Sequence, residues 1–453
     1  MGKFSEMTCE QLVRPEGYDC SCGRHHTCAM QFLKIGPGAI QAVPDMIRAM
    51  GKKHPFVVCD SNTFRVAGEQ VCAILDAANI AYTCYVIPGE RLSPAEWEVG
   101  SVVMHLDTAC DMLLAVGSGV IGDICKVVSH AAGLPTATVG TAPSMDGFAS
   151  NSSSMEVNHV KLTLYNHAPA GIILDTDILS QAPMRMLWAG LGDVAAKYIA
   201  LCEWRISHLV TGEYYCEEIA DLMRTALKKV VEAADGIAQR DPAAIQSVAE
   251  GLVIAGVAMA YAQVSRPASG LEHYFSHMWE MMALERNEPY DLHGIQVGVG
   301  TVLAMKLYEK LRQITPDRGV AMTHIDAFDR TQWEAEVHRI FGKTADEIFA
   351  IEETAHKNDP AGHADRLERI LTHWKEIRAA MDEELPAYEM LLRAMNATGM
   401  PTKPSQLNIG LQDVVDAFVG SREIRNKYLT SSLLWDLGLT EDFAAYLREV
   451  AEA

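Results

Sequence analysis

From Pro55 onward, short uninterrupted apolar runs alternate with longer amphipathic ones. These runs predict, in chain order, a strand at 56–59, a helix at 66–78, a strand at 81–87, a helix at 96–109, a strand at 112–116, a helix at 120–132 and a strand at 136–139. Because strands that are apolar throughout are buried on both faces, we expect a parallel sheet covered by helices on each side. Sheets of this kind bind ligands at the carboxyl ends of their strands.

After about Asp177 the period of the apolar positions changes. One stretch follows the period of about 3.6 that marks a single helix face, at Ile219, Leu222, Met223, Leu227, Val230 and Val231. Further helical runs follow at 252–264, 297–311 and 366–381, without a competing strand pattern. We therefore predict an α/β domain over 1–177, with a cysteine- and histidine-containing extension at 1–30, and an all-helical domain over 178–453.

The balance of charges narrows the classes of partner. The 453 residues include 38 Lys and Arg against 59 Asp and Glu, a net charge of −21. This acidic excess argues against nucleic acid and anionic membranes, since both favour a positive protein surface. The longest uncharged apolar run, 251–264, is shorter than the ~20 residues of a membrane span, and Met1–Arg14 lacks the apolar core of a signal peptide. We expect a cytoplasmic protein without membrane insertion, whose eleven scattered cysteines form no disulfide framework.

A glycine turn, Gly117-Ser118-Gly119, joins a predicted strand to a predicted helix. Glycines let the backbone approach a pyrophosphate, whose charge the helix N-terminus favours. The alternative is an ordinary tight turn, because the sequence is not a G-x-G-x-x-G motif after the first strand. Asp60 ends the first strong strand and could accept hydrogen bonds from an adenosine ribose, which would favour NAD over NADP. It could equally be a turn or N-cap residue.

Several polar residues interrupt apolar surroundings in the helical half. Asp193 follows glycines that we interpret as a helix start, where it could simply be a capping residue. His273 and His277 are four residues apart, on one helix face, and His293 opens the next helical run. Each alone would more often be a core or surface residue. Together, one carboxylate and two imidazoles form a divalent metal site with open positions, which polarises a substrate oxygen. Beside a dinucleotide loop, such a site suggests hydride transfer to a ketone or from an alcohol.

Five segments occur in an order that resembles a known family: 117–126, TAPSMDGF at 141–148, Gly192-Asp193, SRPASGLEH at 265–273 and LHG at 292–294. The chain resembles the sn-glycerol-1-phosphate dehydrogenases, within the iron-containing alcohol dehydrogenase and dehydroquinate synthase superfamily. The resemblance extends over about residues 30–440, including the late run at 422–428. It implies a dehydroquinate synthase-like fold, in which an α/β dinucleotide-binding domain precedes an all-helical metal- and substrate-binding domain. It also implies interconversion of dihydroxyacetone phosphate and sn-glycerol 1-phosphate by hydride transfer at C2, for phospholipid biosynthesis.

The resemblance also implies roles for individual residues. Asp193, His273 and His293 would bind one divalent metal, usually zinc, with nickel or iron as alternatives. Asp146, Asp193 and His277 would face the substrate, where His277 either relays a proton or hydrogen-bonds a hydroxyl. NAD(H) or NADP(H) would be held by Asp60, Gly117, Gly119, Val120, Ile121, Gly122, Asp123, Thr141, Ser144 and Ser150. Ser118 and Val120 depart from the superfamily's usual GGGS. The backbone N–H donors are unaffected by these changes, but the side-chain contact that the serine normally offers is lost. The expected assembly is a homodimer or a larger homo-oligomer.

The substrate and the class of activity leave alternatives open. Arg266 is our candidate for countering the substrate phosphate, because arginine offers two parallel donors; a structural salt bridge is the alternative. A glycerol or other polyol dehydrogenase would use the same metal and cofactor without a phosphate-binding cation. Dehydroquinate synthase would need more basic residues, and a sensor of dinucleotide or metal would have little need for an open metal position.

The N-terminal extension concentrates metal-binding residue types. Cys20, Cys22 and Cys28 lie within nine residues of one another, together with His25 and His26. These side chains could bind zinc, although their spacing is not that of a zinc finger or ribbon. The alternative is a turn-rich cap that packs against the α/β domain.

Overall fold

The computed structural model describes residues 3–89, 92–157 and 160–453. Its contacts divide the chain into two compact units. Unit 1 comprises residues 1–194, 216–267 and 397–399, and unit 2 comprises 195–215, 268–396 and 400–453. The units therefore do not follow the expected ranges 1–177 and 178–453. The last strand of the large sheet ends at Asp175, but several helices that follow it belong to unit 1.

Unit 1 contains a six-stranded parallel sheet in the order β3-β10-β7-β6-β4-β5. The four expected strands are confirmed as β4 (Pro55–Asp60), β5 (Thr83–Ile87), β6 (Met112–Gly117) and β7 (Thr136–Gly140). The sequence pattern missed β3 (Phe32–Gly36) and β10 (Gly171–Asp175). β3 is a short edge strand with an exposed lysine, Lys34, so it does not form a continuous apolar run.

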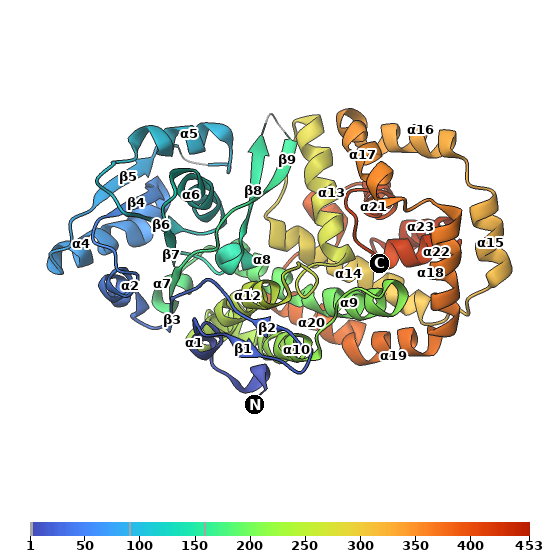
Figure 1. Cartoon of the computed structure of the whole chain (residues 1–453), viewed down its shortest axis with the longest axis horizontal. Coiled ribbons are helices and arrows are strands. Elements are labelled where there is room, and N and C mark those ends of the chain that lie inside the picture. Colours follow the sequence, from blue (N-terminus) through green and yellow to red (C-terminus); the bar gives the residue numbers. More distant parts are fainter. Residues whose placement is uncertain (1–2, 90–91, 158–159) are drawn as a thin grey trace. The chain divides into compact units, whose positions relative to one another are not determined.

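Alternate residues of the central strands enter two separate cores. Val57 and Cys59 pack in one core, with α2 (Val43–Ala49) and α4 (Glu69–Ala77). Their neighbours on β4 pack in the other core, with α5 (Glu96–His105) and α6 (Gly119–Ala132). Figure 1 shows these two pairs of helices on opposite faces of the sheet. The expected parallel sheet, buried on both faces, is thus confirmed.

Unit 1 also contains two antiparallel hairpins and several helices. The hairpins pair β1 (Tyr18–Asp19) with β2 (His25–His26), and β8 (Ser152–Val157) with β9 (Val160–Tyr165). The helical segments are η1 (Phe4–Glu6), α1 (Cys9–Leu12), η2 (Ala39–Ala42), α3 (Ser61–Thr63), the π-turn η3 (Phe64–Gly68), η4 (Asp146–Ala149), α7 (Thr176–Leu179), α8 (Met184–Ala195), α10 (Glu217–Glu232), α11 (Ala234–Ala238) and α12 (Pro242–Ala262).

Helix α12 is longer than its apolar run at 251–264 indicated. Its length and composition would suffice to cross a membrane, but 67% of its most apolar window is buried inside the protein. Burial of this kind is that of a core helix.

In unit 2, all the secondary-structure elements of the described residues are helices, joined by loops, as the sequence predicted. It consists of α9 (Lys197–Thr211), α13 (Leu271–Arg286), α14 (His293–Leu311), α15 (Arg318–Asp326), α16 (Arg330–Phe341), η5 (Gly342–Thr344), α17 (Ala345–Ala355), α18 (Pro360–Thr372), α19 (Trp374–Glu384), most of α20 (Tyr388–Thr398), η6 (Pro404–Leu407), α21 (Leu411–Ser421), α22 (Thr430–Asp436) and α23 (Thr440–Val450). The helical run expected at 366–381 is divided between α18 and α19.

Candidate active site

The glycine turn lies where the strand order of the sheet reverses. From β4 the chain adds β5 on one side and then returns to add β6 on the other. The register pairs Gly117 with Gly140, and it pairs Val58 with Ala115, so that Asp60 ends level with Gly117. Open α/β sheets bind ligands at such a switch point, outside the carboxyl ends of the strands. The turn thus occupies the binding position of the fold, although it does not follow the first strand.

The first turn of α6 fits a pyrophosphate. The Ser118 side chain does not cap the helix; its hydroxyl instead donates to the Ala142 carbonyl (3.2 Å) and lies 2.6 Å from Ser144 Oγ. The N–H groups of the first turn therefore receive no side-chain cap from Ser118 and point toward the position an anion would take. A Cβ on Gly122 would meet no heavy atom within 4 Å, which leaves room for a ligand. A Cβ on Gly117 would lie 2.6 Å from Ile121 Cβ, so Gly117 allows the helix to pack against its strand.

Some of the predicted cofactor-binding residues lie beside the glycine turn. The side chains of others contact neighbouring protein residues instead. Thr141 lies beside the glycine turn, and its N–H donates to the Gly117 carbonyl (3.2 Å). Asp123 instead pairs with the buried Lys126 (2.8 Å), so only its backbone is available for the cofactor. Ser150 lies 2.9 Å from the Ser152 hydroxyl, at the start of β8.

Asp60 has the capping role that its position also allowed. Its Oδ1 accepts the N–H groups of Asn62 (2.8 Å) and Thr63 (2.7 Å), at the N-terminus of α3. The cap fixes the carboxylate at the carboxyl edge of the sheet, level with the glycine turn. A ribose-binding role therefore requires the same side chain to serve two purposes.

The predicted helix start before Asp193 is wrong. Helix α8 begins at Met184, and Asp193 lies in its last turn, fully buried. The glycine Gly190 is a packing residue, because a Cβ there would lie 1.9 Å from the Pro143 carbonyl oxygen. Asp193 Oδ2 accepts the N–H of Asp146 at 2.8 Å. Within unit 1, the predicted metal ligand and the predicted substrate-facing carboxylate are therefore neighbours.

The three predicted histidines come together in unit 2. His273 and His277 lie on α13, and His293 is the first residue of α14. The ring centroid of His293 lies 5.4 Å from that of His273 and 5.4 Å from that of His277. The i, i+4 spacing and the helix start therefore place all three imidazoles in one cluster.

Two glutamates that sequence reasoning missed orient these histidines. Glu272 Oε1 lies 2.8 Å from His273 Nδ1, and Glu280 Oε1 lies 3.1 Å from His293 Nδ1. Both carboxylates are fully buried. A carboxylate on Nδ1 fixes the tautomer that presents Nε2 as a metal ligand. The sequence signal was available, because Glu272 and Glu280 share α13 with two of the histidines.

The environment of His277 disfavours a positive charge on its imidazole. Burial lowers the pKa of His277 well below its ordinary value, and the positive charge of Arg425 acts in the same direction. A neutral imidazole both donates and accepts hydrogen bonds. It can therefore contact a substrate hydroxyl without adding a fixed charge.

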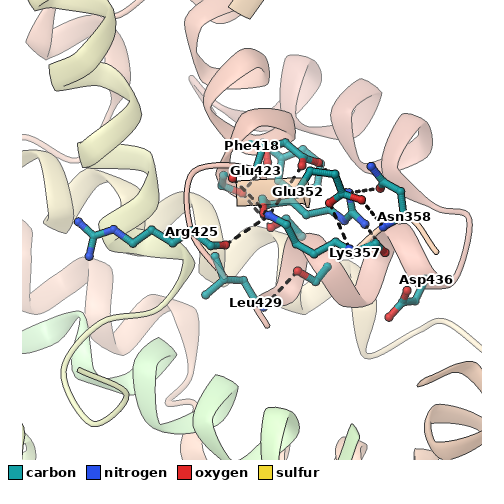
Figure 2. Close-up of polar contacts among 12 residues, drawn as sticks. Glu352, Lys357, Asn358, Phe418, Glu423, Arg425, Leu429 and Asp436 are labelled. Carbon is teal, nitrogen blue, oxygen red and sulfur yellow. Dashed lines mark hydrogen bonds and ion pairs between the residues drawn. The ribbon is translucent and has the colours of Figure 1, made fainter. Parts of the chain in front are cut away.

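Arg425 is a second cation that sequence reasoning did not select for the substrate. It is exposed, in the segment between α21 and α22. A buried cluster holds this segment: Lys357 Nζ donates to the carbonyls of Arg422 (2.6 Å) and Glu423 (3.2 Å), and Arg422 donates to Asn358 (2.8 Å). Figure 2 shows the Arg425 guanidinium extending away from this cluster. The predicted cation, Arg266, is only 3% exposed and belongs to unit 1.

The side chains of Asp193, His273 and His293 have the chemistry expected of ligands to the divalent metal that the resemblance implies. The ligands that the resemblance implies are the buried carboxylate of Asp193 and the imidazoles of His273 and His293, each with a carboxylate on Nδ1. One carboxylate and two imidazoles suit a borderline divalent cation, and three protein ligands would leave positions for a substrate.

Comparisons with known proteins identify the family to which the chain is similar. A family model described as iron-containing alcohol dehydrogenase matches residues 34–183. Proteins named glycerol-1-phosphate dehydrogenase, NAD(P)+, are similar over most of their length. The one from Halalkalibacterium halodurans is 35% identical over 295 residues, covering 64% of this chain and 74% of the relative. The one from Methanosarcina mazei is 38% identical over 279 residues, covering 60% and 75%.

Solved structures share the fold at low sequence identity. Glycerol dehydrogenase from Schizosaccharomyces pombe aligns with a TM-score of 0.59 and 14% identity, over 93% of this chain and 91% of that one. Sulfoacetaldehyde reductase from Bifidobacterium kashiwanohense, in complex with NAD+, aligns with a TM-score of 0.58 and 16% identity, over 94% and 100%. At such identities the likeness establishes the fold alone.

Proposed function

This chain belongs to the glycerol-1-phosphate dehydrogenase family, among the iron-containing alcohol dehydrogenases, and on that basis we propose that it interconverts dihydroxyacetone phosphate and sn-glycerol 1-phosphate with NAD(P)(H). The observation that carries the proposal is the cluster of His273, His277 and His293, two of them oriented by buried glutamates. It occurs in a chain whose relatives act on glycerol 1-phosphate by name.

The dinucleotide would bind at the carboxyl edge of the sheet in unit 1. The uncapped N–H groups at the start of α6 would hold the pyrophosphate, with Gly122 leaving room for it. Asp60 would accept hydrogen bonds from the adenosine ribose. A carboxylate repels a 2′-phosphate, so the proposal favours NADH over NADPH.

Asp193, His273 and His293 would hold a divalent metal, most simply zinc. When bound, the metal and the nicotinamide supply Lewis-acid polarisation of a carbonyl and hydride transfer, respectively. Glu272 and Glu280 hold the two imidazoles in the tautomer that this role requires. Asp146 and neutral His277 would orient the substrate hydroxyl through hydrogen bonds, and His277 can pass a proton between two partners.

The substrate phosphate requires a cation near these groups. Arg266 is the candidate from the sequence, and Arg425 is the candidate that the structure adds, because its charge already acts on His277. Either guanidinium offers parallel donors to a phosphate. These local groups, rather than the net charge of −21, would attract an anionic substrate.

The alternative is a glycerol or other polyol dehydrogenase, an activity named for the structural neighbour from Schizosaccharomyces pombe. The two functions differ in whether a phosphate contributes to binding. We would compare kcat/KM for reduction of dihydroxyacetone phosphate and of dihydroxyacetone by NADH. The proposal predicts a preference of about 100-fold or more for the phosphate ester, since two charge-assisted hydrogen bonds contribute about 1.5–3 kcal/mol each. Equal values would favour the polyol enzyme.

A further inference from the structure

The N-terminal hairpin and a distant helix of unit 1 bring four metal-binding side chains together. Cys20, Cys22 and His26 come from the β1–β2 hairpin, and Cys216 immediately precedes α10. Their ligand atoms all lie within 4.8 Å of one another. The sequence predicted candidate zinc ligands in this segment, but the cluster in the structure has a different membership. It omits Cys28 and His25, and it gains a cysteine 196 positions from Cys20 along the chain.

The distances match those of a tetrahedral zinc site. Zinc binds sulfur at about 2.3 Å and imidazole nitrogen at about 2.0–2.1 Å, which separates neighbouring ligand atoms by about 3.5–3.8 Å. The observed separations are 3.6 Å for Cys20 Sγ and Cys216 Sγ, 3.3 Å for Cys22 Sγ and His26 Nε2, and 3.9 Å for Cys216 Sγ and His26 Nε2. A disulfide would need sulfurs about 2.05 Å apart, so the Cys20–Cys216 distance is that of two ligands of one ion.

The surroundings orient the histidine for this role. His26 Nδ1 lies 2.9 Å from the Tyr261 carbonyl oxygen, which accepts a hydrogen bond from Nδ1–H and leaves Nε2 facing the sulfurs. The ring is 1% exposed and stacks on Tyr261, with centroids 5.5 Å apart. Cys216 is equally buried. By contrast, His25 is exposed, and its nitrogens contact Asp19 and the Glu16 carbonyl.

The hairpin needs a cross-link of this kind. Its strands are two residues long, pairing Tyr18 with His26 and Asp19 with His25. So short a hairpin is not stable alone in water. Through Cys216, an ion would fasten it to α10.

We propose that Cys20, Cys22, His26 and Cys216 form a structural zinc site, separate from the metal site of the proposed reaction. Four protein ligands close the coordination shell, which leaves no position for a substrate. The thiolate-rich donor set selects zinc over the hard divalent cations.

Cobalt substitution of the whole protein distinguishes this site from the catalytic one. The Asp193, His273 and His293 set contains no sulfur, so of these two sites the cysteine site is the one that gives thiolate-to-cobalt charge-transfer absorption. We expect this absorption in the wild-type chain loaded with Co²⁺, with zinc displacing it. It should persist in His273→Ala and in the matched control Cys28→Ser, which removes a cysteine of the same segment.

Elemental analysis gives the second readout. Cys216→Ser and Cys22→Ser should each lose one equivalent of zinc per chain relative to Cys28→Ser. If Cys216→Ser does not fold, its zinc content cannot be interpreted. The cobalt spectrum of the wild type then tests the proposal without any variant. Absence of charge-transfer absorption from the cobalt-loaded wild type would overturn the proposal, as would a Cys20–Cys216 disulfide in the protein purified under reducing conditions. Neither result bears on the dehydrogenase activity.

Discussion

Glu272 and His273 are adjacent in the chain and in contact through their side chains, so they can be tested as a pair. We predict that His273→Ala loses the catalytic metal and reductase activity, because it removes a ligand. Glu272→Gln should keep the ligand but weaken metal affinity about 10- to 100-fold, because it removes only the orienting carboxylate. Metal titration and steady-state assays check both, with the exposed His338→Ala on α16 as control. Near-normal metal content and activity in His273→Ala would contradict the account.

The two candidate arginines for the substrate phosphate differ in burial, which makes their roles separable. Arg425→Ala should raise KM for dihydroxyacetone phosphate about 10- to 100-fold, the loss of one or two charge-assisted contacts. Because Arg425 is exposed, its removal should leave Tm unchanged. Arg266→Ala removes a buried guanidinium. Its KM for dihydroxyacetone phosphate, measured in the same assay, shows which of the two arginines contributes more to binding the phosphate. An Arg425→Ala enzyme with unaltered KM would exclude that residue from the phosphate site.

At the scale of elements, the glycine that ends β6 and a glycine in the first turn of α6 predict opposite phenotypes. Gly117→Ala should lower the free energy of unfolding by about 1–3 kcal/mol, since its Cβ would collide with Ile121. Gly122→Ala should raise stability slightly, because alanine favours the helix, and it should weaken NADH binding, because its Cβ would occupy the open space. Thermal unfolding and NADH fluorescence titration measure the two effects. If Gly122→Ala binds NADH as well as the wild type, the pyrophosphate does not lie over the start of α6.

The central strands and the histidine cluster were predictable because their signals are local. β6 is a continuous apolar run, and His273 and His277 are separated by one helical turn. Asp193 was misplaced because a packing glycine and a glycine at a helix start look alike in sequence; only the contact of Gly190 with Pro143 distinguishes them. Cys216 could not be predicted as a partner of Cys20, since nothing in the sequence between them encodes their contact.

At the scale of the whole molecule, the net charge of −21 says little about the ligands. A dinucleotide and a phosphate ester are both anions. We propose that both are bound by helix-terminal N–H groups, a divalent metal and one or two arginines, which are local sources of positive potential. The acidic excess as a whole would favour solubility.

The proposed reaction can be tested by reduction of dihydroxyacetone phosphate with NADH, followed by a chiral assay of the product. The account predicts NADH oxidation that depends on the phosphate ester and on bound metal, with sn-glycerol 1-phosphate as the product. Oxidation of glycerol without reduction of the phosphate ester, or formation of sn-glycerol 3-phosphate, would contradict it.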